Sequence, residues 1–94
     1  MLSQLPVELA KVKKEDLDRE ILRAGMIAEL DAINFYEQMA ALAQSPDLKL
    51  LLLDIAKEEK THMGEFQTLL LRKDREQKAE LNEGEKEVEE LLGK

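Results

Sequence analysis

The chain of 94 residues contains no cysteine and no tryptophan, and aromatic residues make up only 3% of it. The absence of cysteine excludes disulfides, thiolate metal sites and cysteine nucleophiles, and it fits a reducing cytoplasm. The shortage of aromatic residues argues against a β-sandwich. Apolar runs such as Leu50–Leu53 are far too short to cross a membrane, and residues 1–9 lack the basic and apolar regions of a signal peptide. We therefore expect a cytoplasmic protein with no membrane partner.

Positive charge is also scarce, because 21 acidic residues outweigh 14 basic ones to give a net charge of -7. No basic patch is present to neutralise phosphates, which argues against a nucleic-acid partner. An acidic protein does attract cations. Charged residues make up 37% and hydrophobic residues 44% of the chain, and its abundant Ala, Leu, Glu and Lys are typical of helices with solvated outer faces.

The pattern predicts an all-α fold with an antiparallel two-helix hairpin. The first helix is expected over about Asp16–Ala43 and the second from Pro46 to between Lys73 and Glu80. Ser45 is a good N-cap for the second helix, and Pro46 fits its first position. Such a short connection implies antiparallel neighbours.

The two ends of the chain are expected to differ from this hairpin, which spans residues 15–80. Residues 1–14 are predicted to form an N-terminal arm, which is either a frayed terminus with a few docking contacts or a segment in which Pro6 opens a short helical turn. Residues 81–94 are predicted to form either a short amphipathic helix at about 85–92 or a solvated acidic tail, with Gly84 breaking the helical pattern.

The only histidine, His62, lies one helical turn after Glu59 on the same face of the second helix. Both residues interrupt an apolar stripe at heptad spacing, which consists of Leu48, Leu52, Ile55, Glu59, His62, Phe66 and Leu69. We expect this stripe to be buried. A charge on a buried face is costly unless it is paired or bound to a metal.

Glu29 interrupts the apolar face of the first helix in the same way. With the turn between Ser45 and Pro46, antiparallel packing places Glu29 level with His62 and about one turn, roughly 5 Å, from Glu59. Carboxylate and imidazole ligands together suit iron, manganese or zinc. Di-iron four-helix bundles use two Glu residues and two Glu-x-x-His pairs. One chain holds half of that set, so two chains related by a two-fold axis would complete both the site and the bundle.

Simpler interpretations remain open for each of these residues. Because 15 of the 94 residues are Glu, a Glu-x-x-His pair alone is weak support. His62 could be a core or interface histidine hydrogen-bonded to Glu59 or Glu29, and the two glutamates could lie on a solvated face. Tyr36, two turns from Glu29, is either a packed aromatic or a residue whose hydroxyl reaches a ligand carboxylate of the partner chain.

Residues 28–36, Ala-Glu-Leu-Asp-Ala-Ile-Asn-Phe-Tyr, and residues 58–62, Glu-Glu-Lys-Thr-His, resemble the encapsulated ferritin family. The resemblance extends through Pro46-Asp47-Leu48 and residues 70–74, and covers roughly residues 5 to 80. It implies a two-helix ferritin-like protein that forms a decameric ring of five dimers. It also implies a di-iron ferroxidase centre at a dimer interface, with Glu29, Glu59 and His62 as ligands, Glu59 as the bridge and Tyr36 nearby as a further residue of the catalytic site. Such proteins oxidise Fe(II) and work inside an encapsulin shell, which stores the mineral.

Two departures from the family pattern bear on this expectation. A Glu-Glu-Leu-Glu run is common in the family where this chain has Ala28-Glu29-Leu30-Asp31, which leaves an outer metal site in question; Asp31 and Glu65 are candidates for an acidic access path or plain surface charges. The family also often ends in a shell-targeting peptide with a Gly-Ser-Leu-Arg-like core, whereas this chain stops at Leu91-Leu92-Gly93-Lys94. The domain is either shortened or joined to the shell protein itself, as in some relatives.

Three functions follow as hypotheses. The first is a ferroxidase that delivers iron for storage inside an encapsulin nanocompartment. The second is another ferritin-like reaction, either a peroxidase of the rubrerythrin kind or a manganese enzyme. The third is a non-enzymatic helical oligomer that serves as a scaffold, in which the His–Glu pair is only structural.

Overall fold

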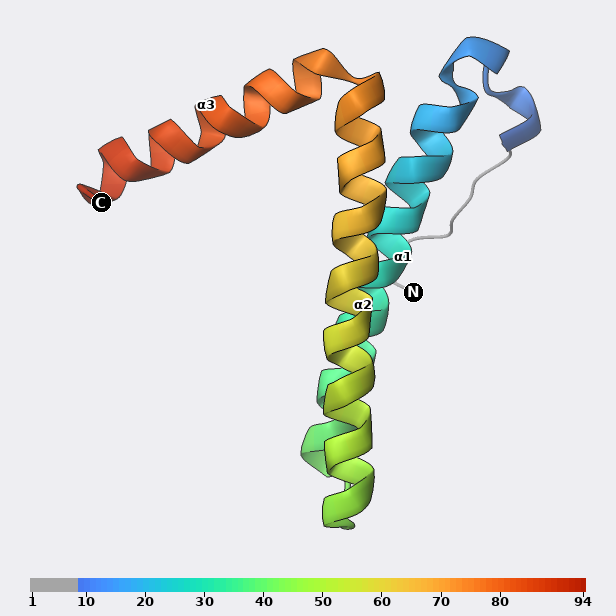
Figure 1. Cartoon of the computed structure of the whole chain (residues 1–94), viewed down its shortest axis with the longest axis vertical. Helices are drawn as coiled ribbons and strands as arrows, with labels where there is room; N and C mark the ends of the chain where they lie inside the picture. The colour runs from blue at the N-terminus through green and yellow to red at the C-terminus, as the bar shows by residue number, and fades with distance from the viewer. Residues whose placement is uncertain (1–8) are drawn as a thin grey trace.

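Long helices dominate residues 9–94, the part of the chain that the computed structural model describes (Figure 1). A 3-10 turn at Leu9–Lys11 precedes α1 (Lys14–Leu42), α2 (Pro46–Lys73) and α3 (Arg75–Leu92). The first two helices lie side by side as an antiparallel hairpin, and α3 projects away from it. The predicted all-helical hairpin is confirmed, whereas the turn predicted at Pro6 lies outside the described residues. Within residues 9–94, no helix combines the length and apolar character needed to cross a membrane.

The connection between α1 and α2 has the predicted cap. The Ser45 hydroxyl oxygen accepts a hydrogen bond of 3.3 Å from the backbone N–H of Leu48. Pro46 occupies the first helical position and Asp47 lies in the first turn, where a negative charge is favourable. Ala43 closes α1 with its N–H donated to the carbonyl oxygen of Met39. This tight turn fixes the register in which the two helices face each other.

A second sharp turn separates α2 from α3 at Asp74. Asp74 leaves the helical conformation (φ -129°, ψ 88°), and its carboxylate accepts a hydrogen bond of 3.0 Å from the Gln77 N–H at the start of α3. The same carboxylate receives a 2.8 Å hydrogen bond from the guanidinium of Arg23 in α1. Asp74 is therefore both the N-cap of α3 and a link back to the hairpin.

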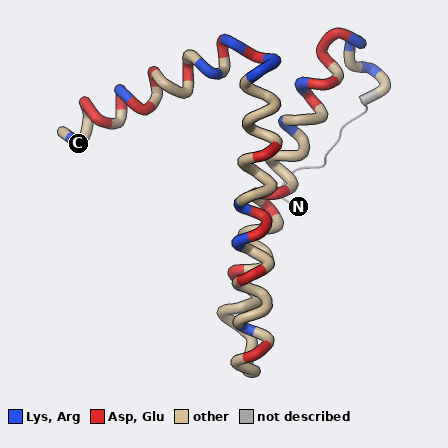
Figure 2. The backbone as a smooth tube through the Cα atoms, in the orientation of Figure 1, with Lys and Arg blue, Asp and Glu red and all other residues tan. Residues whose placement is uncertain are grey.

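The C-terminal helix is longer than the sequence pattern predicted. It begins at Arg75 rather than near residue 85, and Gly84 lies inside it instead of breaking it. A single helical glycine costs only about 1 kcal/mol relative to alanine, and an N-cap such as that of Asp74 contributes a similar amount in the opposite direction. Charges of both signs are interspersed along α3 (Figure 2), and none of its residues is buried.

The core between α1 and α2 is thin. Five apolar side chains of the described residues are buried: Leu22, Ile33, Ala40, Ala56 and Leu70. The prediction of a buried stripe through Glu59 and His62 is wrong for the single chain, because none of the seven residues is fully buried and Leu48, His62 and Leu69 are exposed. A two-helix hairpin has one inner face, and α1 covers this stripe only in part.

Candidate metal centre

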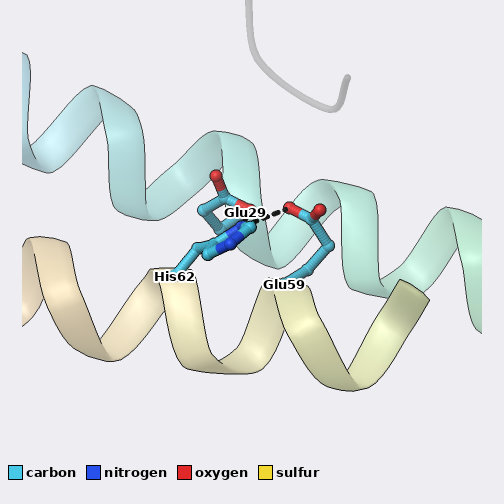
Figure 3. A group of neighbouring side chains, drawn as sticks. All are labelled: Glu29, Glu59 and His62. Atoms are coloured by element: carbon cyan, nitrogen blue, oxygen red, sulfur yellow. Dashed lines mark ion pairs between the residues drawn. The ribbon is translucent and has the colours of Figure 1, made fainter. Parts of the chain in front are cut away.

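Three side chains from α1 and α2 converge near the middle of the hairpin. Glu29 comes from α1, and Glu59 and His62 come from successive turns of α2 (Figure 3). Each offers one donor atom, and the three atoms all lie within 4.8 Å of one another. The antiparallel register predicted from the position of the turn has therefore placed Glu29 level with the Glu-x-x-His pair. Among residues 9–94, no other three His, Asp or Glu side chains converge in this way.

The contacts within this cluster are too long to be hydrogen bonds. His62 Nδ1 lies 3.8 Å from Glu29 Oε2 and 3.7 Å from Glu59 Oε2, whereas N–H···O hydrogen bonds span about 2.7–3.2 Å. The interpretation of His62 as a histidine that is hydrogen-bonded to these glutamates is therefore not supported in the single chain. The spacing instead leaves room for an ion bound by all three groups.

Burial makes the cluster costly without an ion. The side chains of Glu29 and Glu59 are only 18% and 19% exposed. Glu29 Oε2 is buried and has no hydrogen-bond partner. A buried acceptor left unsatisfied costs about 1–3 kcal/mol, and more when it is charged. A cation held between Glu29, Glu59 and His62 would remove that cost, so the residues fit a metal ion.

The donor set indicates which metals fit. Two carboxylates and one imidazole, with no thiolate available, favour iron, manganese or zinc over copper(I) or an iron–sulfur cluster. The side chain of His62 is 46% exposed, so the cluster is open to solvent at this histidine. Three protein ligands leave further coordination positions for a second metal, a substrate or water.

Tyr36 lies outside the cluster. It follows Glu29 by seven residues in α1, a rise of about 10 Å, and its ring packs edge-on against Phe35 with centroids 5.3 Å apart. Its participation in the catalytic site therefore stays a prediction that involves a second chain. The access path through Asp31 and Glu65 likewise stays a prediction.

The link between Arg23 and Asp74 was not anticipated from sequence. It joins residues 51 positions apart, and local sequence patterns give no signal for a contact over such a separation. The backbone N–H of Gln77, and after it Arg23, hold the pKa of Asp74 below its usual value of 3.8, while partial desolvation acts in the opposite direction.

Comparison with known proteins identifies the family. Residues 20–92 match the family model described as Rubrerythrin. The chain is 52% identical over 96 residues to the ferritin-like–encapsulin shell fusion protein of Pyrococcus furiosus. That alignment covers 99% of this chain but only 28% of the fusion protein, so the chain spans about a quarter of that relative.

Among solved structures, the crystal structure of the encapsulated ferritin domain from Pyrococcus furiosus is similar over the whole chain. The TM-score is 0.85 at 48% identity, and the match covers 100% of this chain and 98% of that one. Similarity at this level extends to α3 as well as to the hairpin that carries Glu29, Glu59 and His62. The chain belongs to the rubrerythrin family, within which it is an encapsulated ferritin-like domain related to the Pyrococcus fusion protein.

Proposed function

We propose that this protein is a ferroxidase, which oxidises Fe(II) to Fe(III) at a di-iron centre formed between two chains. The observation that carries the proposal is the buried Glu29 oxygen, which has no hydrogen-bond partner and lies beside Glu59 and His62. Family membership supports it, because ferritin-like bundles hold two irons with glutamates and Glu-x-x-His pairs. Iron in this proposal is both the occupant of the site and the substrate.

The proposed dimer follows from what the single chain leaves incomplete. One chain supplies one glutamate and one Glu-x-x-His pair, half of the ligands of a di-iron bundle. Its stripe through His62 leaves Leu48 and Leu69 exposed, as expected for a surface that a second hairpin covers. A two-fold axis near His62 would complete the ligands and the core together. The resemblance to encapsulated ferritins extends this to a ring of five dimers.

The residues of the centre have separable roles. Glu29 and Glu59 supply negative charge, which favours Fe(III) over Fe(II) and so assists loss of an electron. The imidazole of His62 would bind the metal as a neutral ligand. When bound, the two irons supply the electrons that reduce O2 or peroxide. Glu59 is the proposed bridge between the two metals.

The proposed partner is an encapsulin shell. The Pyrococcus relative is described as a fusion of a ferritin-like part to an encapsulin shell, and this chain aligns with 28% of it. By extension, we propose that this protein works inside such a compartment in the cytoplasm and delivers iron for storage there. Co-expression with an encapsulin from the same cell tests this, since the chain should sediment with assembled shells.

The ferroxidase proposal is tested by Fe(II) oxidation under air, followed through the ultraviolet absorbance of Fe(III). His62→Ala and Glu59→Ala should each lower the rate at least about 10-fold, because each removes a ligand. Glu58→Ala is the matched control, since Glu58 neighbours Glu59 but lies outside the cluster. Rates like those of the wild type in both ligand variants would contradict the assignment.

The rubrerythrin family match favours peroxide reduction as a second candidate. The chain has no cysteine for a rubredoxin-type electron-transfer site, so a peroxidase would need an electron donor from outside the chain. H2O2 reduction that continues with a chemical reductant after the added Fe(II) has been oxidised would favour the peroxidase. A ferroxidase stops when its Fe(II) is used up.

A further inference from the structure

Gly25 has no side chain, and the ring of Phe66 occupies the space that a side chain there would need. A Cβ atom at Gly25 would lie 2.9 Å from Cδ1 and Cε1 and 3.0 Å from Cζ of Phe66. At the other three glycines, Gly64, Gly84 and Gly93, a Cβ would meet nothing within 4 Å. Carbon atoms in contact stay about 3.5–4.0 Å apart, so the Phe66 ring occupies space that any other residue at position 25 would need.

This contact lies directly beside the metal centre. Gly25 precedes Glu29 by one turn of α1, and Phe66 follows His62 by one turn of α2. Residues four apart share a helix face. The ring therefore packs against the backbone of α1 in the layer next to the donor atoms, where it separates the helix that carries Glu29 from the helix that carries His62.

The fully buried side chains that flank this height are Leu22 and Ile33 on α1 and Ala56 and Leu70 on α2. Between them, Met26 of α1 and Met63 of α2 are half-buried and line one apolar pocket. Methionine side chains are flexible and adapt to a change in helix spacing, whereas the rigid Phe66 ring occupies the space that a Cβ at Gly25 would need. The contact of Gly25 with Phe66 is therefore a tight steric constraint on one side of the centre.

We propose that Gly25 and Phe66 are a positioning pair that sets the distance between Glu29 and the Glu59–His62 pair. The inference rests on the proposed metal function and adds to it two residues that bind no metal. Glycine lets α1 approach the ring, and the ring stops the approach at the separation that the donor atoms need.

The distances show why a single methyl group matters. Relieving a 2.9 Å contact to an ordinary carbon–carbon distance requires a movement of about 0.5–1 Å. Metal–ligand distances tolerate only about 0.2 Å. A movement of α1 away from α2 would therefore take Glu29 out of reach of an ion held by Glu59 and His62.

The test is a double-mutant cycle with Co(II) as the probe, measured by calorimetry on the full chain without oxygen. Gly25→Ala should weaken Co(II) binding at least about 10-fold, as expected when ligand orientation is lost. Phe66→Leu removes the ring, so adding Gly25→Ala to it should have no further effect. Gly84→Ala is the matched control, because it makes the same change in open space and should leave binding unchanged.

Each outcome of the cycle supports or overturns the proposal. Unchanged Co(II) binding in Gly25→Ala would mean that the Phe66 ring moves aside, and it overturns the proposal. So does a double variant that binds more weakly than Phe66→Leu alone. If Gly25→Ala does not fold by circular dichroism, the double variant decides, since it should both fold and bind Co(II) like Phe66→Leu.

Failure of the positioning pair is distinguishable from failure of the proposed function. A wild-type protein that binds no Co(II) or Fe(II) would end the metal function. Suppose instead that the wild-type protein binds both metals and oxidises iron, and that Gly25→Ala does the same. This result would contradict only the inference on Gly25 and Phe66 and would leave the proposed function in place.

Discussion

Glu29 carries a cost in the metal-free protein that a bound cation would remove. Its Oε2 atom is buried without a hydrogen bond, and it lies close to a second carboxylate, that of Glu59. Removal of the charge should relieve both penalties in the absence of metal. Function and stability therefore favour different residues at this position, which is typical of sites that bind ions.

We predict that Glu29→Gln stabilises the metal-free protein by about 1 kcal/mol and abolishes Fe(II) binding. Thermal unfolding in the presence of a chelator measures the first effect, and anaerobic titration measures the second. Glu37→Gln is the matched control on the same helix. Glu37 pairs with Lys60 at 3.2 Å on the surface, so its loss should change stability little and in the opposite direction. A less stable metal-free Glu29→Gln variant would contradict the prediction.

The residues of the site were largely predictable, but their surroundings were not. Helical periodicity and the position of the Ser45–Pro46 turn were sufficient to bring Glu29, Glu59 and His62 together. The half-exposed state of His62 was not predictable, because periodicity shows which residues share a face and not whether one chain can cover it. Phe66 was expected only as a member of the apolar stripe, since its contact with Gly25 depends on the distance between the helices.

At the scale of the helices, the turn at Asp74 determines where α3 begins. Pattern analysis placed that start about ten residues too late, because it relied on Gly84 as a helix breaker. Asp74 itself carries a cap signal, but the contact that secures it comes from Arg23 in α1, 51 positions away. A contact between distant residues is invisible to local propensity. The turn between α1 and α2 was predicted because its cap and proline are adjacent in sequence.

The Asp74 turn should weaken in acid. The N–H of Gln77 and the Arg23 guanidinium hold the pKa of Asp74 below its usual 3.8. The stability that this carboxylate contributes is therefore fully present above pH 3.8 and is lost as the pH falls through the lowered pKa. The Gln77 amide shift in NMR spectra should report a transition below pH 3.8.

Asp74→Asn should remove this transition, whereas Asp47→Asn, at the start of α2, should keep it. A Gln77 transition above pH 3.8 would show that the Gln77 and Arg23 contacts do not favour the charged form of Asp74. The helical signal of α3 residues should fall together with the Gln77 transition, because loss of the cap leaves the first N–H groups of α3 unpaired.

Gly84→Ala should stabilise α3. The position is exposed, helical and without neighbours that a Cβ would meet. Replacement of a helical glycine by alanine gains about 0.5–1 kcal/mol through the unfolded state. Slower amide exchange within α3, compared with the wild type, measures the effect. Unchanged exchange in α3 would indicate that other chains, and not helix propensity, limit its stability.

At the scale of the whole molecule, we predict that Leu69→Gln weakens both association and metal binding. Leu69 is exposed one heptad after His62 on the same stripe, so it lies on the proposed contact between two hairpins. Thr68→Gln is the matched control at the adjacent position. Native mass measurement during anaerobic Fe(II) titration reports both quantities, and the wild type should bind two irons per two chains.

A Leu69→Gln variant that keeps the native mass and iron content of the wild type would place the contact elsewhere. One iron on an isolated single chain would contradict a centre shared by two chains.

The general hairpin was predictable from periodicity, but the extent of its uncovered surface follows only from the structure. Within the described part of the chain, the large apolar residues with the highest exposed fractions are Leu91, Leu42 and Leu50, in α3 and near the turn of the hairpin.

Because the core is thin, the stability of the fold should depend on protein concentration. Five buried side chains, two of them alanines, hold α1 and α2 together, and they bury little surface against the entropy of ordering the chain. If association supplies the rest, the melting temperature becomes a function of protein concentration rather than a constant of the sequence. Confinement in a small volume would then keep the protein folded, and dilution alone would unfold it.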